Sequence, residues 1–183
     1  MKKVEIKYKF IYLLKKIVMK KVFILVATLI GFMSQAQEAY KGKGDTKFHV
    51  GANLQSGGTG LNVGTDFGLG ENISVGVVAN YLLGVKSIEG DDYDFLDRAD
   101  LKARFNANIG KVLTLPEQID VYPGLDLGLR NFGGHLGARY FFSEGFGLQV
   151  ETGVPFAKYK KDPVGFDRLN NQFYVNLSAV FNL

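Results

Sequence analysis

The sequence of 183 residues contains no cysteine, no tryptophan and only two histidines. The absence of cysteine excludes a disulfide scaffold, a thiol nucleophile, a cysteine-ligated zinc site and a lipid-modified lipoprotein cysteine. The two histidines, His49 and His135, leave little material for a histidine-based metal site. We therefore expect no metal site, no bound cofactor and no catalytic residues.

The N-terminus has the anatomy of a secretory signal peptide. The charged start Met19-Lys20-Lys21 is followed by an apolar run of 12 residues, 22–33, and by the small residues of Ser34-Gln35-Ala36. The run is shorter than the roughly 20 residues of a membrane helix, and we expect cleavage after Ala36. Because residues 1–18 also begin with Met-Lys-Lys, a true translation start at Met19 is the favoured interpretation. A long basic n-region is the alternative.

The basic charge of the chain belongs to this leader. Residues 1–36 hold 8 of the 22 basic and 1 of the 18 acidic residues, so residues 37–183 carry 14 basic and 17 acidic side chains, a net charge of −3. A nucleic-acid partner is therefore not expected. The same 147 residues hold 22 of the 23 glycines, about double the usual share of ~7%. Export, abundant glycine and aromatic residues favour an all-β envelope protein.

The mature chain alternates between apolar and polar residues with a period of two. In residues 99–110 the odd positions are apolar and the even positions are polar, and residues 173–183 repeat the pattern. Such segments exceed the usual 5–6 residues of soluble strands and fit the 9–11 residues of a tilted transmembrane strand. Six further segments bring the total to eight strands: 46–55, 59–69, 72–82, 118–130, 133–142 and 146–157.

The lengths of the connections alternate as well. If the N-terminus starts in the periplasm, the turns 70–71, 110–117 and 143–145 face the periplasm, and the connections 56–58, 84–98, 131–132 and 158–170 face outside. Both long polar connections then fall on the outer side, as in transmembrane barrels. We therefore divide the mature chain into a short periplasmic lead-in, 37–45, and a barrel domain, 46–183.

Aromatic side chains sort into two levels on the apolar faces, which is typical of membrane interfaces. The expected girdle residues at the periplasmic strand ends are Phe48, Phe67, Phe142, Phe146 and Phe181, and those at the outer ends are Tyr81, Phe156 and Phe173.

The signal peptide, the eight amphipathic strands, the long outer loops and the alternating C-terminal strand together resemble the small outer-membrane β-barrels of the OmpA/OmpX-like group, over residues 46–183. The resemblance implies an all-β, eight-stranded antiparallel up-and-down transmembrane barrel of the porin-like kind in the outer membrane of a Gram-negative bacterium. Its partners would be outer-membrane lipid and the barrel-assembly machinery. The last strand ends on Leu183, with Phe181 two residues earlier, whereas the group usually ends on an aromatic residue. Pro123 and Pro155 lie inside expected strands, and we expect them near strand ends or at bulges.

The polar faces should point into the barrel. Eight strands enclose an interior that side chains can fill, and mixed charges there should pair. We expect a closed, ion-paired lumen rather than a proton or ion path. The expected lumen network is Asp100, Lys102, Arg104, Asp126, Arg139 and Glu151, and the same faces carry Asp66, Asn80, Asp120, Arg130, His135 and Gln149.

Two other functions are compatible with parts of this pattern. An outer-membrane lipid-modifying enzyme would use His135 with a serine such as Ser56 or Ser87 in the outer connections, but no Gly-x-Ser-x-Gly motif is present. A structural role is favoured for this histidine, and we expect no enzyme. The second alternative is a soluble exported barrel of lipocalin type, whose apolar faces would point inward around an apolar ligand.

The two long connections carry opposite charge. Residues 84–98 have a net charge of −3 and residues 158–170 a net charge of +2. We expect them to approach each other over the barrel opening. The function predicted from the sequence is a structural or surface-interaction role, in which these two loops meet an extracellular or envelope protein partner.

Overall fold

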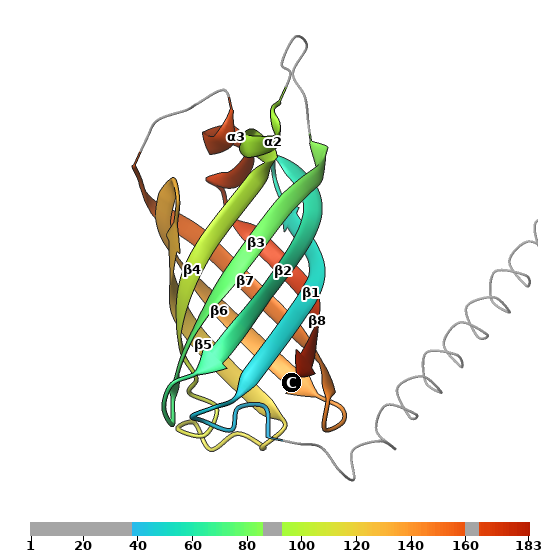
Figure 1. Cartoon of the computed structure of the whole chain (residues 1–183), viewed down its shortest axis with the longest axis vertical. Helices are drawn as coiled ribbons and strands as arrows, with labels where there is room; N and C mark the ends of the chain where they lie inside the picture. Colours follow the sequence, from blue (N-terminus) through green and yellow to red (C-terminus); the bar gives the residue numbers. More distant parts are fainter. Residues whose placement is uncertain (1–37, 86–92, 160–164) are drawn as a thin grey trace, which may run out of the picture. The chain divides into compact units, whose positions relative to one another are not determined.

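A computed structural model describes residues 38–85, 93–159 and 165–183 (Figure 1). Within them, eight strands form one closed antiparallel barrel, in which each strand pairs with the next along the chain and the last pairs with the first. The elements are β1 (Thr46–Gln55), β2 (Gly58–Gly68), β3 (Ile73–Val85), α2 (Phe95–Arg98), β4 (Ala99–Ala107), β5 (Ile119–Gly128), β6 (Asn131–Phe141), β7 (Phe146–Lys158), α3 (Phe166–Asn170) and β8 (Tyr174–Asn182). The predicted fold class is confirmed. The predicted signal peptide and start site fall on residues 1–37, outside the described residues.

The strand ends agree with the ranges predicted from alternation to within three residues. We call the end of the barrel where β1 begins and β8 finishes the terminal end. The opposite end, which carries α2 and α3, is the loop end (Figure 1). No helix in the described ranges is both long and apolar enough to cross a membrane.

The strands turn their polar side chains inward and their apolar side chains outward. In β4, the side chains of Lys102 and Arg104 are buried, whereas Leu101 and Phe105 are 46% and 43% exposed. The other strands follow the same alternation, because successive side chains of a strand point to opposite faces. The interior of the barrel is therefore polar and its wall apolar, the inverse of a soluble core.

The two strand prolines behave differently. Pro155 pairs with Gly133 next to a register shift, where Phe156 is the extra residue of a bulge in β7, as expected. The expectation is wrong for Pro123, which lies inside β5. On the side of β4, however, the ladder stops at the pair of Asn106 with Gly124. Proline has no N–H to donate, so its position fits the point where this ladder ends.

Residues 38–45, expected as a simple lead-in, fold across the terminal end. Ala39 is fully buried in a cluster with Phe141 and Val180. Its backbone N–H donates to the Glu117 carbonyl at 2.6 Å. This segment therefore packs against the terminal end of the barrel.

Tyr40 fastens the same segment to the turn between β2 and β3. Its hydroxyl donates to the Ile73 carbonyl at 2.6 Å and lies 2.9 Å from the Gly70 carbonyl. Burial, reinforced by the carboxylates of Asp45 and Asp120, raises the pKa of Tyr40 to about 12. An ordinary tyrosine is already protonated at neutral pH, and the raised pKa of Tyr40 keeps its hydroxyl a donor to higher pH.

Candidate functional site

The centre of the lumen is built on two arginines that stack on one tyrosine. Arg104 from β4 and Arg139 from β6 are both buried. Their guanidinium carbons lie 5.6 Å and 4.1 Å from the ring centre of Tyr122, which β5 points inward. A desolvated guanidinium on an aromatic face is held by a cation–π interaction. This interaction fixes the positions of two like charges in the middle of the barrel.

Buried carboxylates surround the two arginines. Asp66 bridges them, with oxygens 3.4 Å from Nε of Arg104 and 3.3 Å from Nη2 of Arg139. Arg104 also pairs with Glu151, and Nε of Arg139 lies 3.8 Å from Asp120. Ionic side chains without water need such partners, because an unpaired buried charge is strongly destabilising.

A second group lies beside this cluster. Nδ1 of His135 is 2.9 Å from Asp126, and its Nε2 is 2.9 Å from the side-chain oxygen of Asn106. The Tyr174 hydroxyl donates to the other oxygen of Asp126 at 2.9 Å. Asp126 is the cross-strand neighbour of Arg104, yet its hydrogen bonds go to a histidine and a tyrosine.

The lysine of the predicted network lies nearer the loop end. Nζ of Lys102 is 3.1 Å from Asp100 and 4.8 Å from the ring centre of Tyr174. The structure thus buries all six predicted lumen residues and brings them into paired groups. Their pairing also depends on Tyr122 and Tyr174, which the sequence analysis did not single out.

Inward-facing glycines make room for these large side chains. A Cβ built on Gly137 would collide with the ring of Tyr122, and one built on Gly124 would collide with His135. A strand glycine often marks such a close approach. A glycine on the polar face, beside a long or aromatic inward residue, is therefore the sequence signal that could have located Tyr122.

The lumen side chains do not bring together a recognisable catalytic or metal site. Within the described ranges no group of three or more His, Asp and Glu side chains is arranged to hold a metal ion. His135 is buried between Asp126, Asn106 and Arg104, deeper than the outer strand end where the enzyme interpretation places it. Ser56 is exposed at the loop end, and Ser87 lies outside the described residues.

The two long connections meet at the loop end. Leu169 from α3 packs with Leu82 and Tyr93 in a buried cluster, and the Asn170 amide donates to the Asp97 carbonyl of α2. We call these contacts the loop clamp.

A cation from a third connection supports the loop clamp. The Arg130 guanidinium lies 4.7 Å from the ring centre of Phe166 and 3.9 Å from the Asp97 carboxylate. The approach predicted for loops 84–98 and 158–170 is therefore observed for their described parts, through apolar packing and a hydrogen bond. Its predicted cause, the opposite charge of the loops, depends largely on residues outside the described ones: Lys86, Glu89, Asp91, Asp92, Lys160, Lys161 and Asp162.

The aromatic residues of the terminal end form a continuous row across four strands. Ring centres are 6.3 Å apart for Phe48 and Phe181, 5.5 Å for Phe181 and Phe146, and 6.1 Å for Phe146 and Phe142. Tyr140, which was not predicted, extends the row at 4.9 Å from Phe142. We call these five residues the aromatic row.

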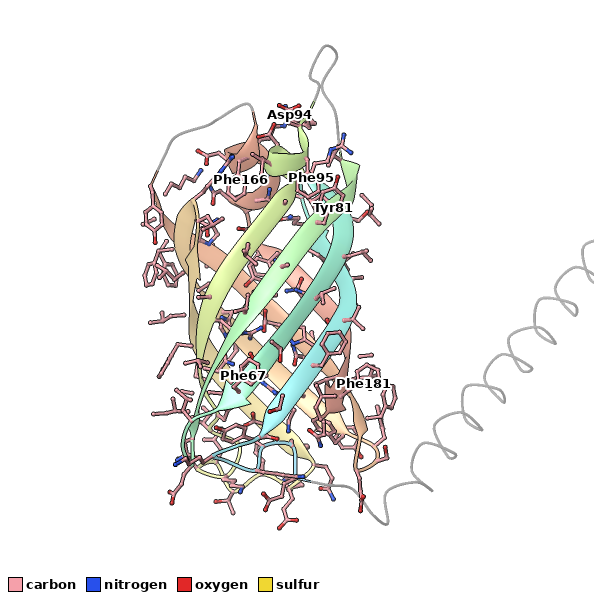
Figure 2. The ribbon with its side chains drawn as sticks, viewed as in Figure 1. Phe67, Tyr81, Asp94, Phe95, Phe166 and Phe181 are labelled. Carbon is pink, nitrogen blue, oxygen red and sulfur yellow. The ribbon has the colours of Figure 1, made fainter. Side chains whose placement is uncertain are left out.

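At the loop end the predicted aromatic residues have unpredicted neighbours. The ring centre of Tyr81 lies 5.1 Å from that of Phe95, and Phe156 lies 6.1 Å from Phe132. Figure 2 shows Phe67 and Phe181 toward the terminal end, and Tyr81 and Phe95 toward the loop end. Phe67 and Phe173 are 45% and 60% exposed.

Comparison with known proteins supports the fold. No curated protein matches the chain. Among solved structures, the N-terminal β-barrel domain of Pseudomonas aeruginosa OprF is similar, with a TM-score of 0.51 and 8% sequence identity over 78% of this chain and 100% of that chain. The OmpA-like barrel fold implied by the resemblance is therefore confirmed. A family model matches residues 29–183, and the chain belongs to that family, the family of unknown function DUF6646.

Proposed function

We propose that the chain is an integral outer-membrane β-barrel whose loops carry a structural or surface-interaction role. One observation carries this proposal: the wall of the barrel is apolar all round, while charged residues fill its interior. Each strand contributes an outward apolar side chain that is 37–52% exposed, namely Val50, Leu61, Val77, Leu101, Leu125, Leu136, Leu148 and Leu177. A soluble monomer rarely exposes so extensive an apolar surface, whereas hydrocarbon solvates it well.

The height of the apolar wall fits a bilayer. Phe146 and Phe156 mark the two aromatic levels on β7 and are ten residues apart. At about 3.4 Å per residue and a tilt of 35–45°, they differ in height by roughly 24–28 Å. This matches the apolar band of about 25 Å that transmembrane barrels present between their aromatic girdles.

The filled lumen favours a closed barrel. The paired Arg104 and Arg139 occupy the lumen, Ala39 of residues 38–45 is buried at the terminal end, and the loop clamp packs at the loop end. In this proposal the partners are outer-membrane lipid, the barrel-assembly machinery that inserts the strands, and a protein that meets the loops. No catalytic step is assigned to the lumen residues.

Cell fractionation tests the membrane assignment and separates it from the lipocalin alternative. We expect the protein in the outer-membrane fraction, extracted only by detergent, and with a gel mobility that changes on heating. Release into the soluble periplasmic fraction, with ligand-dependent stability in the absence of detergent, would favour the soluble barrel and overturn the proposal.

A further inference from the structure

The apolar wall is hollowed on one side, between β5 and β8. A depression of about 530 Å³ lies there, in the half of the barrel nearer the terminal end. Its floor contains the small side chains Ala138 and Ala179, and larger side chains border it: Tyr140, Leu148, Val150 and Leu177. We call this depression the wall groove.

The strand register explains why the wall groove exists. Ala138 of β6 is paired with Val150 of β7, and Ala179 of β8 is paired with Leu148 of β7. Each alanine is thus a low point beside a branched side chain that projects from the wall. The groove offers little polar surface, because the backbone groups of these strands bond within the sheet and the intervening polar side chains turn inward.

The groove is continuous with the aromatic row. Tyr140 belongs to both, and its ring centre lies 4.9 Å from that of Phe142. Tyrosine and phenylalanine at this level of a membrane barrel lie near the lipid headgroups, and a tyrosine hydroxyl there can bond to an ester or a phosphate. The site therefore combines an apolar trough with one polar contact at the end where a headgroup would lie.

We propose that the wall groove is a binding site for one acyl chain of a phospholipid in the leaflet on the terminal side. This inference rests on the proposed membrane location. A flexible hydrocarbon chain fits a trough with little polar surface, because it can follow the floor and is held there by close packing.

A second copy of the chain is a poorer occupant. A two-fold dimer places the same patch of each subunit against itself. Two facing hollows would leave unfilled space between the subunits, and the packing contacts at the two alanines would be lost. A lipid chain fills the same space without requiring a complementary protrusion.

The test fills the groove by replacing its alanines with larger residues and measures how much lipid remains bound. The barrel is reconstituted into vesicles of phosphatidylethanolamine and phosphatidylglycerol, extracted with a mild detergent and weighed by native mass spectrometry. We expect one retained phospholipid for the unchanged protein and about tenfold less retention for the Ala138→Leu, Ala179→Leu double variant. The matched control is Ala79→Leu with Ala103→Leu, the same change on the outward faces of β3 and β4, which should not alter retention.

The outcomes separate the site from the membrane location. Equal lipid retention in the filled and control variants, or a dimer mass that disappears when the groove is filled, would overturn the groove proposal alone. A barrel that never enters the vesicles would overturn the proposed function, and the groove proposal with it. Heat-modifiable mobility checks that each variant folds. If the double variant does not fold, Ala138→Val and Ala179→Val are the milder substitutes, and each is expected to weaken retention.

Discussion

Replacing Arg104 by leucine tests the buried ion pairs most severely. The Arg104 side chain is fully buried and pairs with Asp66 at 3.4 Å and with Glu151. In the variant, Asp66 keeps Arg139 at 3.3 Å. Glu151 loses its cation and keeps neutral partners such as the Tyr122 hydroxyl at 3.3 Å. The change therefore leaves one uncompensated carboxylate in the lumen.

The expected loss of stability follows from this uncompensated carboxylate. Removing one partner of a buried pair costs about 3–5 kcal/mol of folding free energy, whereas replacing both partners by apolar residues is often nearly neutral. We expect a loss in this range for Arg104→Leu and a smaller loss for Glu151→Leu, because Arg104 keeps Asp66 at 3.4 Å in that variant. The double variant should be more stable than the sum of the two single losses predicts, by about 2 kcal/mol or more.

The assay is urea unfolding of the barrel in lipid vesicles, followed by circular dichroism and gel mobility. Lys111→Ala is the control, because this lysine forms an exposed ion pair with Glu38 at 2.9 Å and should contribute only about 0–1 kcal/mol. If Arg104→Leu loses less than about 1 kcal/mol, or if the single losses simply add, Arg104 and Glu151 are not a desolvated pair. The account of the lumen would then be wrong.

Three further predictions concern the interior and the loop end. Gly137→Ala should destabilise the barrel by about 1–3 kcal/mol in the same assay, because its methyl group would collide with Tyr122. Gly145→Ala, which adds a methyl group in open space, should not. Leu169→Ala should lower stability by about 2–5 kcal/mol and speed protease cleavage of the loop end, because Leu169 is fully buried in the loop clamp. Leu96→Ala is the control, at a site 63% exposed. Planar bilayers containing the unchanged protein should show no large, stable single-channel currents, and their presence would contradict the closed lumen.

The fold was predictable because the alternation runs along the strands with few breaks, such as the inward-facing Val78 of β3 and Val180 of β8. In residues 99–107, five apolar and four polar positions assign every side chain to one face, with no tertiary information required. The lengths of the strands, and the side on which long connections fall, then indicated a membrane-type barrel. Pro123 was placed wrongly, since alternation does not show where a ladder between two strands stops.

The sequence predicted which residues face the lumen better than it predicted which of them contact each other. Alternation places Arg104 and Asp126 on the same face. It does not show which side chains they contact across the barrel. Asp126 is instead bonded to His135 and Tyr174, from β6 and β8. Such contacts depend on strand tilt and on the space that inward glycines leave, which only the closed barrel fixes. The contacts of the loop clamp could not be predicted either, because α2 and α3 are too short to carry a periodic pattern.

The most direct test of the central claim asks whether the wall contacts hydrocarbon. The chain has no tryptophan, so a single tryptophan reports on one position without background. Leu125→Trp places it on the outer wall of β5, and Leu96→Trp places it on α2 at the loop end. In vesicles whose lipids carry bromine on the acyl chains, we expect strong quenching and blue-shifted emission at position 125 and weak quenching at position 96. Water-like emission at position 125, quenched by aqueous iodide rather than by brominated lipid, would contradict the account.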